Sequence, residues 1–179
     1  MLNETNQLFH YILHSGNVLS TLDHRRLLEL VEGLDWPEPG NPPPSSYYDL
    51  KGYRSQMLIE PEHGEIFDLI HKAHIRLMPS IYEHYGDTLP KDPIYDKYSG
   101  YWLCKYPEGG YLSPHVDVDA DAGSVTASYT INDDYEGGWI TFWGKYNHLF
   151  KHEVTPVTKG ERYSVITWFS YEKGKEWLT

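Results

Sequence analysis

The sequence has almost no cysteine, no excess of basic charge and no long apolar run, and each absence excludes a class of protein. Cys104 is the only cysteine, so no intrachain disulfide can form and we expect a reducing compartment, most simply the cytoplasm. The formal net charge of −11 argues against nucleic-acid binding through a basic surface. No apolar stretch approaches membrane-spanning length. The N-terminal M-L-N-E-T-N-Q also lacks the pattern of a signal peptide. We therefore expect no nucleic-acid partner and no membrane partner.

The length of 179 residues suits a single domain, and its first half carries helical signals. Ser20 or Thr21 is a candidate N-cap for an amphipathic helix that ends at Gly33. Residues 64–85 have the apolar spacing of a second, longer helix, which contains Pro79. The Pro-rich stretch 37–48 between them is either a lid over a site or a plain surface loop.

The second half reads instead as strands separated by Gly-containing turns. The expected strands are 101–106, 124–131, 139–143, 152–157 and 162–169. Helices followed by strands predict an α+β fold, in which helices support one face of a mostly antiparallel sheet system. We expect one domain over 1–179, with helical support and the Pro-rich stretch in 1–93 and the β core in 94–179.

Alternation along the last strand separates a polar face from an apolar one. One side carries Arg162, Ser164, Ile166 and Trp168, and the other carries Tyr163, Val165, Thr167 and Phe169. Two interpretations stay open. The polar face either lines a site for a charged ligand, or it is solvated while the apolar face forms the core.

The stretch S-P-H-V-D contains a candidate metal-ligand pair. His115 and Asp117 are two residues apart, so an extended backbone directs both side chains the same way. Together with a second histidine they would form the facial triad of non-haem Fe(II) oxygenases. An H-x-D pattern alone is weak evidence for such a site. We expect the helical His71 and His74 to be surface or packed imidazoles, and Cys104 to fill core space.

The order of motifs in 101–169 resembles the Fe(II)- and 2-oxoglutarate-dependent dioxygenases, specifically the prolyl 4-hydroxylase-like branch. The matching pieces are K-Y-P-E-G-G-Y-L-S-P-H-V-D, Y-T-I-N-D-D-Y-E-G-G-W-I-T-F and H-E-V-T-P-V-T-K-G-E-R-Y-S-V-I-T-W-F. The resemblance covers the last 80 or so residues strongly and the first half loosely. It implies a double-stranded β-helix, or jelly-roll barrel, supported by the N-terminal helices.

The resemblance also implies roles for particular residues. His115, Asp117 and His152 would bind Fe(II), and Arg162 would bind the distal carboxylate of 2-oxoglutarate through its planar fork. These four residues form the expected catalytic set. Further expected co-substrate contacts are Ser164, Tyr106, Thr130, Tyr129 and Trp168. The implied cofactors are Fe(II), 2-oxoglutarate and O2, with ascorbate as a candidate reductant.

Two departures from the family pattern accompany the resemblance. Thr130 stands where the family often has a tyrosine, with Tyr129 beside it. The chain between Asp117 and His152 is also short, so we expect a trimmed barrel or a shortened minor sheet, and His148 competes with His152 as the distal ligand.

The function implied is hydroxylation of a C–H bond, with release of succinate and CO2. The expected substrate is a prolyl residue in a peptide or protein. One alternative is a hydroxylase of a free amino acid or another small molecule. The other is a non-catalytic metal-binding β-barrel module.

Overall fold

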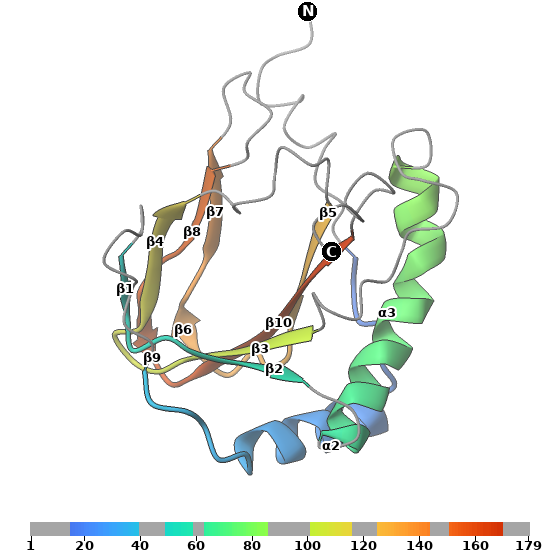
Figure 1. The fold of residues 1–179 in the computed structure, drawn as a ribbon, viewed down its shortest axis with the longest axis horizontal. Helices are drawn as coiled ribbons and strands as arrows, with labels where there is room; N and C mark the ends of the chain where they lie inside the picture. Colours follow the sequence, from blue (N-terminus) through green and yellow to red (C-terminus); the bar gives the residue numbers. More distant parts are fainter. Residues whose placement is uncertain are drawn as a thin grey trace, which may run out of the picture.

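The structure is a computed structural model that describes residues 15–39, 49–58, 63–85, 101–115, 125–143 and 151–169. Element labels follow Figure 1. The described elements are α2 (Thr21–Glu32), β1 (Leu50–Lys51), β2 (Arg54–Leu58), α3 (Gly64–Tyr85), β3 (Tyr101–Tyr106), β4 (Tyr111–His115), β5 (Val125–Thr130), β6 (Glu136–Gly137), β7 (Ile140–Trp143), β8 (Lys151–Val154), β9 (Val157–Lys159) and β10 (Arg162–Phe169).

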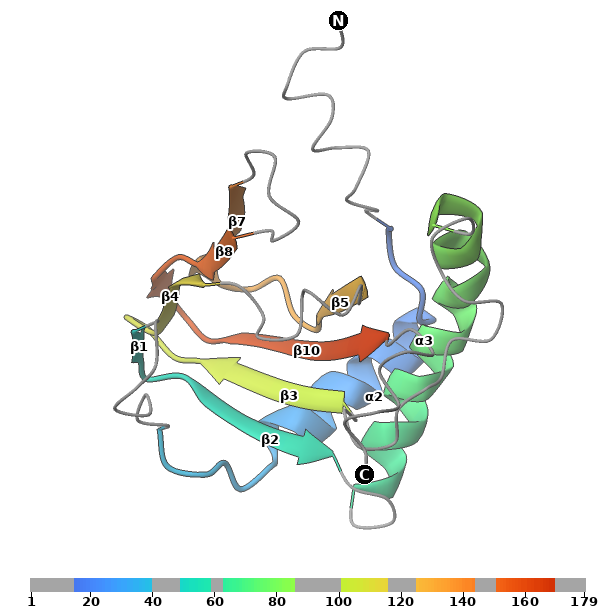
Figure 2. The same cartoon turned by 45° about the horizontal axis from the view of Figure 1, so that its top comes forward.

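Most strands belong to two antiparallel sheets of four strands each. The major sheet has the order β2-β3-β10-β5, and the minor sheet has the order β1-β4-β8-β7. Strands β6 and β9 form a separate two-stranded ribbon. Figures 1 and 2 show α2 and α3 on the side of the major sheet that faces away from the minor sheet. The architecture is therefore a mixture of a few helices and several antiparallel sheets, as the sequence predicted.

Both predicted helices are present, and local capping explains where α2 begins. The Ser20 hydroxyl accepts a hydrogen bond from the Asp23 N–H and so caps α2, which ends before Gly33. Helix α3 continues through Pro79 to Tyr85. No helix in the described part of the chain is long and apolar enough to cross a membrane.

The helices cover one face of the major sheet with an apolar core. Leu27 and Val31 of α2, with Ile66 and Ile70 of α3, belong to the same buried cluster as four sheet residues: Tyr101, Leu103, Tyr163 and Val165. These sheet residues alternate along β3 and β10, as expected for strands with one face against helices. We call this the helix face of the major sheet.

The opposite face of the major sheet points toward the minor sheet. A second cluster unites Cys104 and Tyr106 of β3 with Leu112 of β4, Val154 of β8 and Val157 of β9. Register pairs Tyr106 with Arg162 and Cys104 with Ser164, so these residues share this inter-sheet face. Arg162 and Ser164 are each only 1% exposed. The interpretation that this polar face is solvated is therefore wrong for both residues, although Thr130 at the edge strand is exposed.

Three features of the fold differ from the sequence prediction. Strands β1 and β2 lie between the two helices along the chain, so helices and strands are not strictly segregated. The single strand expected over 152–157 is divided into β8 and β9, because Pro156 has no N–H to continue a ladder. The minor sheet still has four strands, although β1 has only two residues.

Candidate functional site

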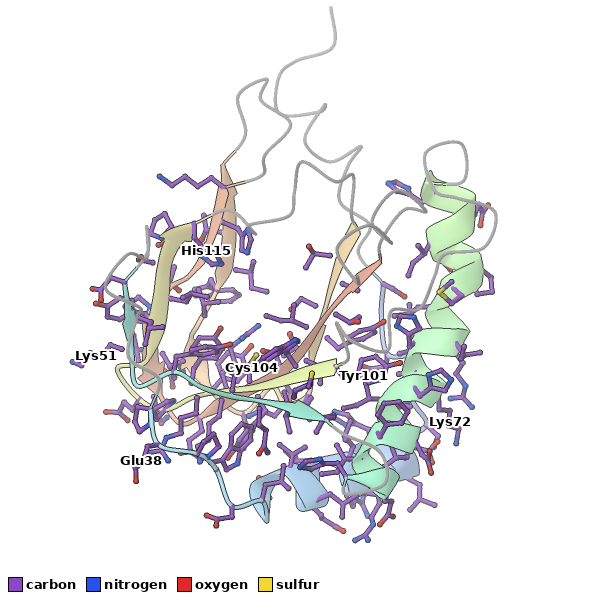
Figure 3. The ribbon with its side chains drawn as sticks, viewed as in Figure 1. Glu38, Lys51, Lys72, Tyr101, Cys104 and His115 are labelled. Carbon is purple, nitrogen blue, oxygen red and sulfur yellow. The ribbon has the colours of Figure 1, made fainter. Side chains whose placement is uncertain are left out.

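The rings of His115 and His152 lie side by side on neighbouring strands of the minor sheet. They are register partners on β4 and β8, with ring centroids 4.3 Å apart. Val154 belongs to the inter-sheet cluster, and His152 lies two residues before it on the same extended strand. The two imidazoles therefore face the gap between the sheets. Figure 3 shows His115 on the minor sheet and Cys104 on the major sheet.

A bulge in β4 brings His115 to this face. Leu112 pairs with Val154 and His115 pairs with His152, and the register shifts between these two pairs. Three residue steps along β4 thus lie opposite two steps along β8. In a regular strand, residues three apart such as Leu112 and His115 would point to opposite faces. Pro114 lies within the bulge and has no N–H for the ladder.

Hydrogen bonds on the other side of β4 fix the bulge. The Ser113 N–H donates to the Asp49 carbonyl at 2.7 Å, and the Asp49 N–H donates to the Ser113 hydroxyl at 2.6 Å. The Tyr111 hydroxyl also donates to the Asp49 carboxylate at 2.6 Å. We call Asp49, Tyr111 and Ser113 the β4 clamp.

The clamp leads directly to His115, because the Ser113 carbonyl lies 2.8 Å from His115 Nδ1. A carbonyl can only accept, so Nδ1 carries the proton and the lone pair of the neutral ring is on Nε2. Metal-binding histidines are oriented in this way by a backbone carbonyl on the other nitrogen.

Arg162, which begins β10, is the largest fully buried side chain in the described part of the chain. Its Nη1 donates to the Ser164 hydroxyl at 2.9 Å, and its guanidinium carbon lies 5.2 Å from the centroid of the Tyr106 ring. Within the described part of the chain, its buried Nε has no hydrogen-bond partner and no carboxylate forms an ion pair with its guanidinium. An unpaired buried cation costs free energy, so this position favours an anionic ligand.

Two tyrosines and a cysteine contact one another beside Arg162. The Tyr53 and Tyr106 rings are 5.0 Å apart, and the Tyr53 hydroxyl lies 3.4 Å from the Cys104 sulfur. Burial raises the pKa of the Cys104 thiol to about 11 and also raises the pKa of the Tyr106 hydroxyl. Both groups stay protonated near neutral pH. The Tyr106 hydroxyl is buried and has no hydrogen-bond partner among the described residues, so it is available to donate to a ligand.

A glycine allows the chain to approach Arg162 closely. Gly138 has φ +61°, and a Cβ at this position would lie 3.0 Å from Arg162 Cδ and 3.0 Å from Val157 Cγ2. A larger residue would have to displace the aliphatic part of the arginine. Gly138, the second glycine of E-G-G-W, therefore leaves the space that the Arg162 side chain occupies.

The structure brings some of the predicted site residues together and separates others. Ser164 contacts Arg162, and Thr130 is its register partner on β5. Tyr129 instead pairs with Val165 and lies on the helix face, where its hydroxyl is 2.9 Å from His74 Nδ1. The geometry therefore does not bring Tyr129 to Arg162. The backbone register of Trp168 places it on the Ser164 side of β10, but nothing is described of its side chain.

Several predicted features lie outside the described residues. They are Asp117, the competing ligand His148 and most of the Pro-rich stretch, 40–48. Among the described residues no set of three or more metal-ligating side chains comes together. The described part of the expected facial triad is thus the pair of His115 and His152.

Sequence reasoning did not find the residues that support the site. Tyr53 contacts Cys104, and the Ser113 carbonyl contacts His115. Asn132 contacts the backbone beside Arg162. Tyr53 directly precedes β2, so side-chain alternation along that strand could have assigned Tyr53 to a face. Its contact with Cys104 could not be predicted, because it depends on the pairing of β2 with β3. Ser113 and Asn132 lie inside stretches that resemble the family, but their hydrogen bonds depend on the folded chain.

The side chains fit a metal ion and a dicarboxylic acid. A pair of imidazoles suits Fe(II) and related divalent metals. In His115 the Nδ1 bonds to a carbonyl, which leaves Nε2 for the metal. The unpaired Nε of Arg162 and the unpaired Tyr106 hydroxyl are donors that suit a carboxylate on the major-sheet side.

Comparisons with known proteins agree with this arrangement at the level of the fold. No family model matches the sequence, and no curated protein matches it. Among solved structures, the chain is similar to a prolyl hydroxylase of Trichoplax adhaerens in complex with a hypoxia inducible factor peptide fragment. That match has a TM-score of 0.71 and 17% identity, and it covers 97% of this chain and 90% of the other.

Two bacterial structures are also similar. A Pseudomonas putida prolyl-4-hydroxylase matches with a TM-score of 0.57 and 22% identity, over 87% of this chain and 89% of the other. An oxidoreductase of the 2OG-Fe(II) oxygenase family from Burkholderia pseudomallei matches with a TM-score of 0.58 and 14% identity, over 88% and 82% of the two chains. The resemblance identified in the sequence is confirmed in the structure: this chain has the fold of the prolyl hydroxylase-like 2-oxoglutarate oxygenases.

Proposed function

We propose that this protein is an Fe(II)- and 2-oxoglutarate-dependent dioxygenase with a double-stranded β-helix core. The observation that carries the proposal is the burial of Arg162 at 1% exposure, without a carboxylate partner among the described residues, on the face that looks toward His115 and His152. A structural protein would gain stability by replacing an unpaired buried cation with an apolar residue. A binding site for a carboxylate explains why the arginine is there.

Each residue has a defined task in this proposal. His115, His152 and Asp117 would hold the metal, and Arg162 would bind the distal carboxylate of 2-oxoglutarate, with help from the Ser164 hydroxyl. When bound, Fe(II), 2-oxoglutarate and O2 supply the oxidation: 2-oxoglutarate, O2 and a C–H bond give succinate, CO2 and a C–OH group. Apolar residues of the inter-sheet cluster, such as Leu112 and Val154, would exclude water between the metal and Arg162.

We further propose that the substrate is a prolyl residue within a peptide. The Trichoplax adhaerens structure that this chain resembles holds a peptide fragment, which supports an extended substrate. The net charge of −11 would favour peptides with Lys or Arg near the target, through an attraction that weakens as salt is added. Hydroxylation of a free amino acid is the competing function.

The test is succinate formation by Fe(II)-loaded protein with proline-containing peptides and with free L-proline. We expect succinate above the uncoupled background with at least one basic peptide, and a mass gain of one oxygen on that peptide. His152→Ala is the control variant, which we expect to form no succinate. Faster turnover of free proline than of every peptide would support the small-molecule alternative. Metal binding without any succinate would support the non-catalytic module.

A further inference from the structure

The side chain of Asn132 connects the two backbone groups on either side of Arg162. Its Nδ2 donates to the Glu161 carbonyl at 2.7 Å, and its Oδ1 accepts from the Tyr163 N–H at 2.8 Å. Nδ2 also donates to the Asp134 carboxylate at 2.6 Å. Asn132 is 5% exposed, and its hydrogen bond with the Tyr163 N–H is buried.

This connection lies where the pairing of β10 with β5 has ended. The ladder between β10 and β5 runs from Phe169 to Ser164, and the backbone bond from Ile131 N to Tyr163 O follows it. At Arg162 itself, β3 is the one described strand that still pairs with β10, through Tyr106. The Asn132 carboxamide takes the place of a strand at the point where β10 begins.

We propose that Asn132 is a positioning residue for Arg162, an inference that rests on the proposed function. The direction of a buried side chain depends on the backbone that carries it, and Asn132 bonds to the carbonyl before Arg162 and to the N–H after it. A guanidinium that is held in place before the ligand arrives loses less freedom on binding. Asn132 therefore raises the affinity for the distal carboxylate without touching it.

A merely structural role for Asn132 predicts a different pattern. Loss of folding stability would weaken every ligand alike. Loss of Arg162 position would weaken only ligands that reach Arg162. The pair 2-oxoglutarate and 2-oxobutanoate separates the two cases, because both have the same keto-acid end for the metal and only the first has a distal carboxylate.

The experiment measures dissociation constants of both keto acids for the Mn(II)-loaded protein by titration calorimetry. We expect Asn132→Ala to weaken 2-oxoglutarate about tenfold, and 2-oxobutanoate less than about twofold. Asn132→Asp keeps the shape of the side chain and removes both N–H donors, and it is the second variant if Asn132→Ala does not fold. Asp134→Ala is the matched control. It removes one partner of Asn132 but leaves the hydrogen bonds to the Glu161 carbonyl and the Tyr163 N–H, so we expect wild-type affinities for both acids.

Equal weakening of the two acids in both Asn132 variants would overturn the inference, and so would wild-type affinity for 2-oxoglutarate. Arg162→Met tests the proposed function separately. It should bring the two acids close to the same affinity, because it removes the charge that recognises the distal carboxylate. If Arg162→Met keeps a full preference for 2-oxoglutarate, the proposed function fails, whatever the Asn132 variants show.

Discussion

His115 and His152 are register partners across β4 and β8, and their ring centroids are 4.3 Å apart. This relationship supports the proposal that His152 is the second imidazole ligand, because His152 lies directly opposite His115 on β8. The pairing depends on a bulge that only the folded chain has.

The first prediction concerns this ligand assignment. We expect His152→Ala to lose Mn(II) affinity and all succinate formation, because one of the two imidazoles is removed. His148→Ala should keep both properties and is the matched control. Loss of metal binding in His148→Ala, together with its retention in His152→Ala, would show that the assignment is wrong. Circular dichroism of both variants checks that the fold is retained.

The second prediction concerns the β4 clamp. Ser113→Ala removes the hydroxyl that accepts from the Asp49 N–H, so the carbonyl that orients His115 is held less firmly. We expect Mn(II) affinity to fall about tenfold, the lower end of the range for residues that orient metal ligands. Ser128→Ala, at an exposed position of β5, removes a hydroxyl outside the clamp and should bind Mn(II) as the wild type does. Wild-type affinity in Ser113→Ala would show that the clamp has no effect on His115.

These predictions depend on features that differ in how far the sequence reveals them. Helix α2 could be predicted because its signals are local: Ser20 caps it and its apolar residues have helical spacing. Strand β10 could be predicted from its alternation alone. The bulge in β4 could not, because the ratio of residues across a ladder depends on the partner strand.

The candidate site shows the same division. The resemblance named His115, His152 and Arg162, and the structure buries Arg162 on the face that looks toward the two histidines. The resemblance implied that both Tyr129 and Thr130 contact the co-substrate. Neighbours on a strand point to opposite faces, and only the pairing of Ser164 with Thr130 decides which residue lies on the Arg162 side. Long-range register is therefore the information that the sequence does not carry.

The third prediction concerns pH and the helix face of the major sheet. His74 of α3 is 2% exposed, and its Nδ1 lies 2.9 Å from the Tyr129 hydroxyl. Burial, with a smaller effect of His71, lowers the pKa of His74 from 6.5 to about 4. Between these values the unfolded chain binds a proton that the folded chain does not, so the free energy of unfolding falls as the pH drops. The total loss from this residue is about 3 kcal/mol.

Urea unfolding between pH 7 and pH 4.5 measures this loss. Carboxylates contribute to the same range, so the comparison is between variants. We expect His74→Gln to have a flatter dependence on pH than the wild type, because glutamine cannot be protonated. Identical slopes in His74→Gln and the wild type would contradict the burial of a neutral His74.

The most direct test of the account is the affinity of Mn(II)-loaded protein for 2-oxoglutarate, compared between the wild type and Arg162→Lys. Lysine keeps the positive charge but loses the planar fork that matches a carboxylate. The account predicts metal-dependent binding in the wild type and a loss of about 1–3 kcal/mol in the variant, the scale of a hydrogen bond to a charged group. Equal binding by both proteins, or no binding by the wild type, would contradict the claim that Arg162 is the anchor for 2-oxoglutarate.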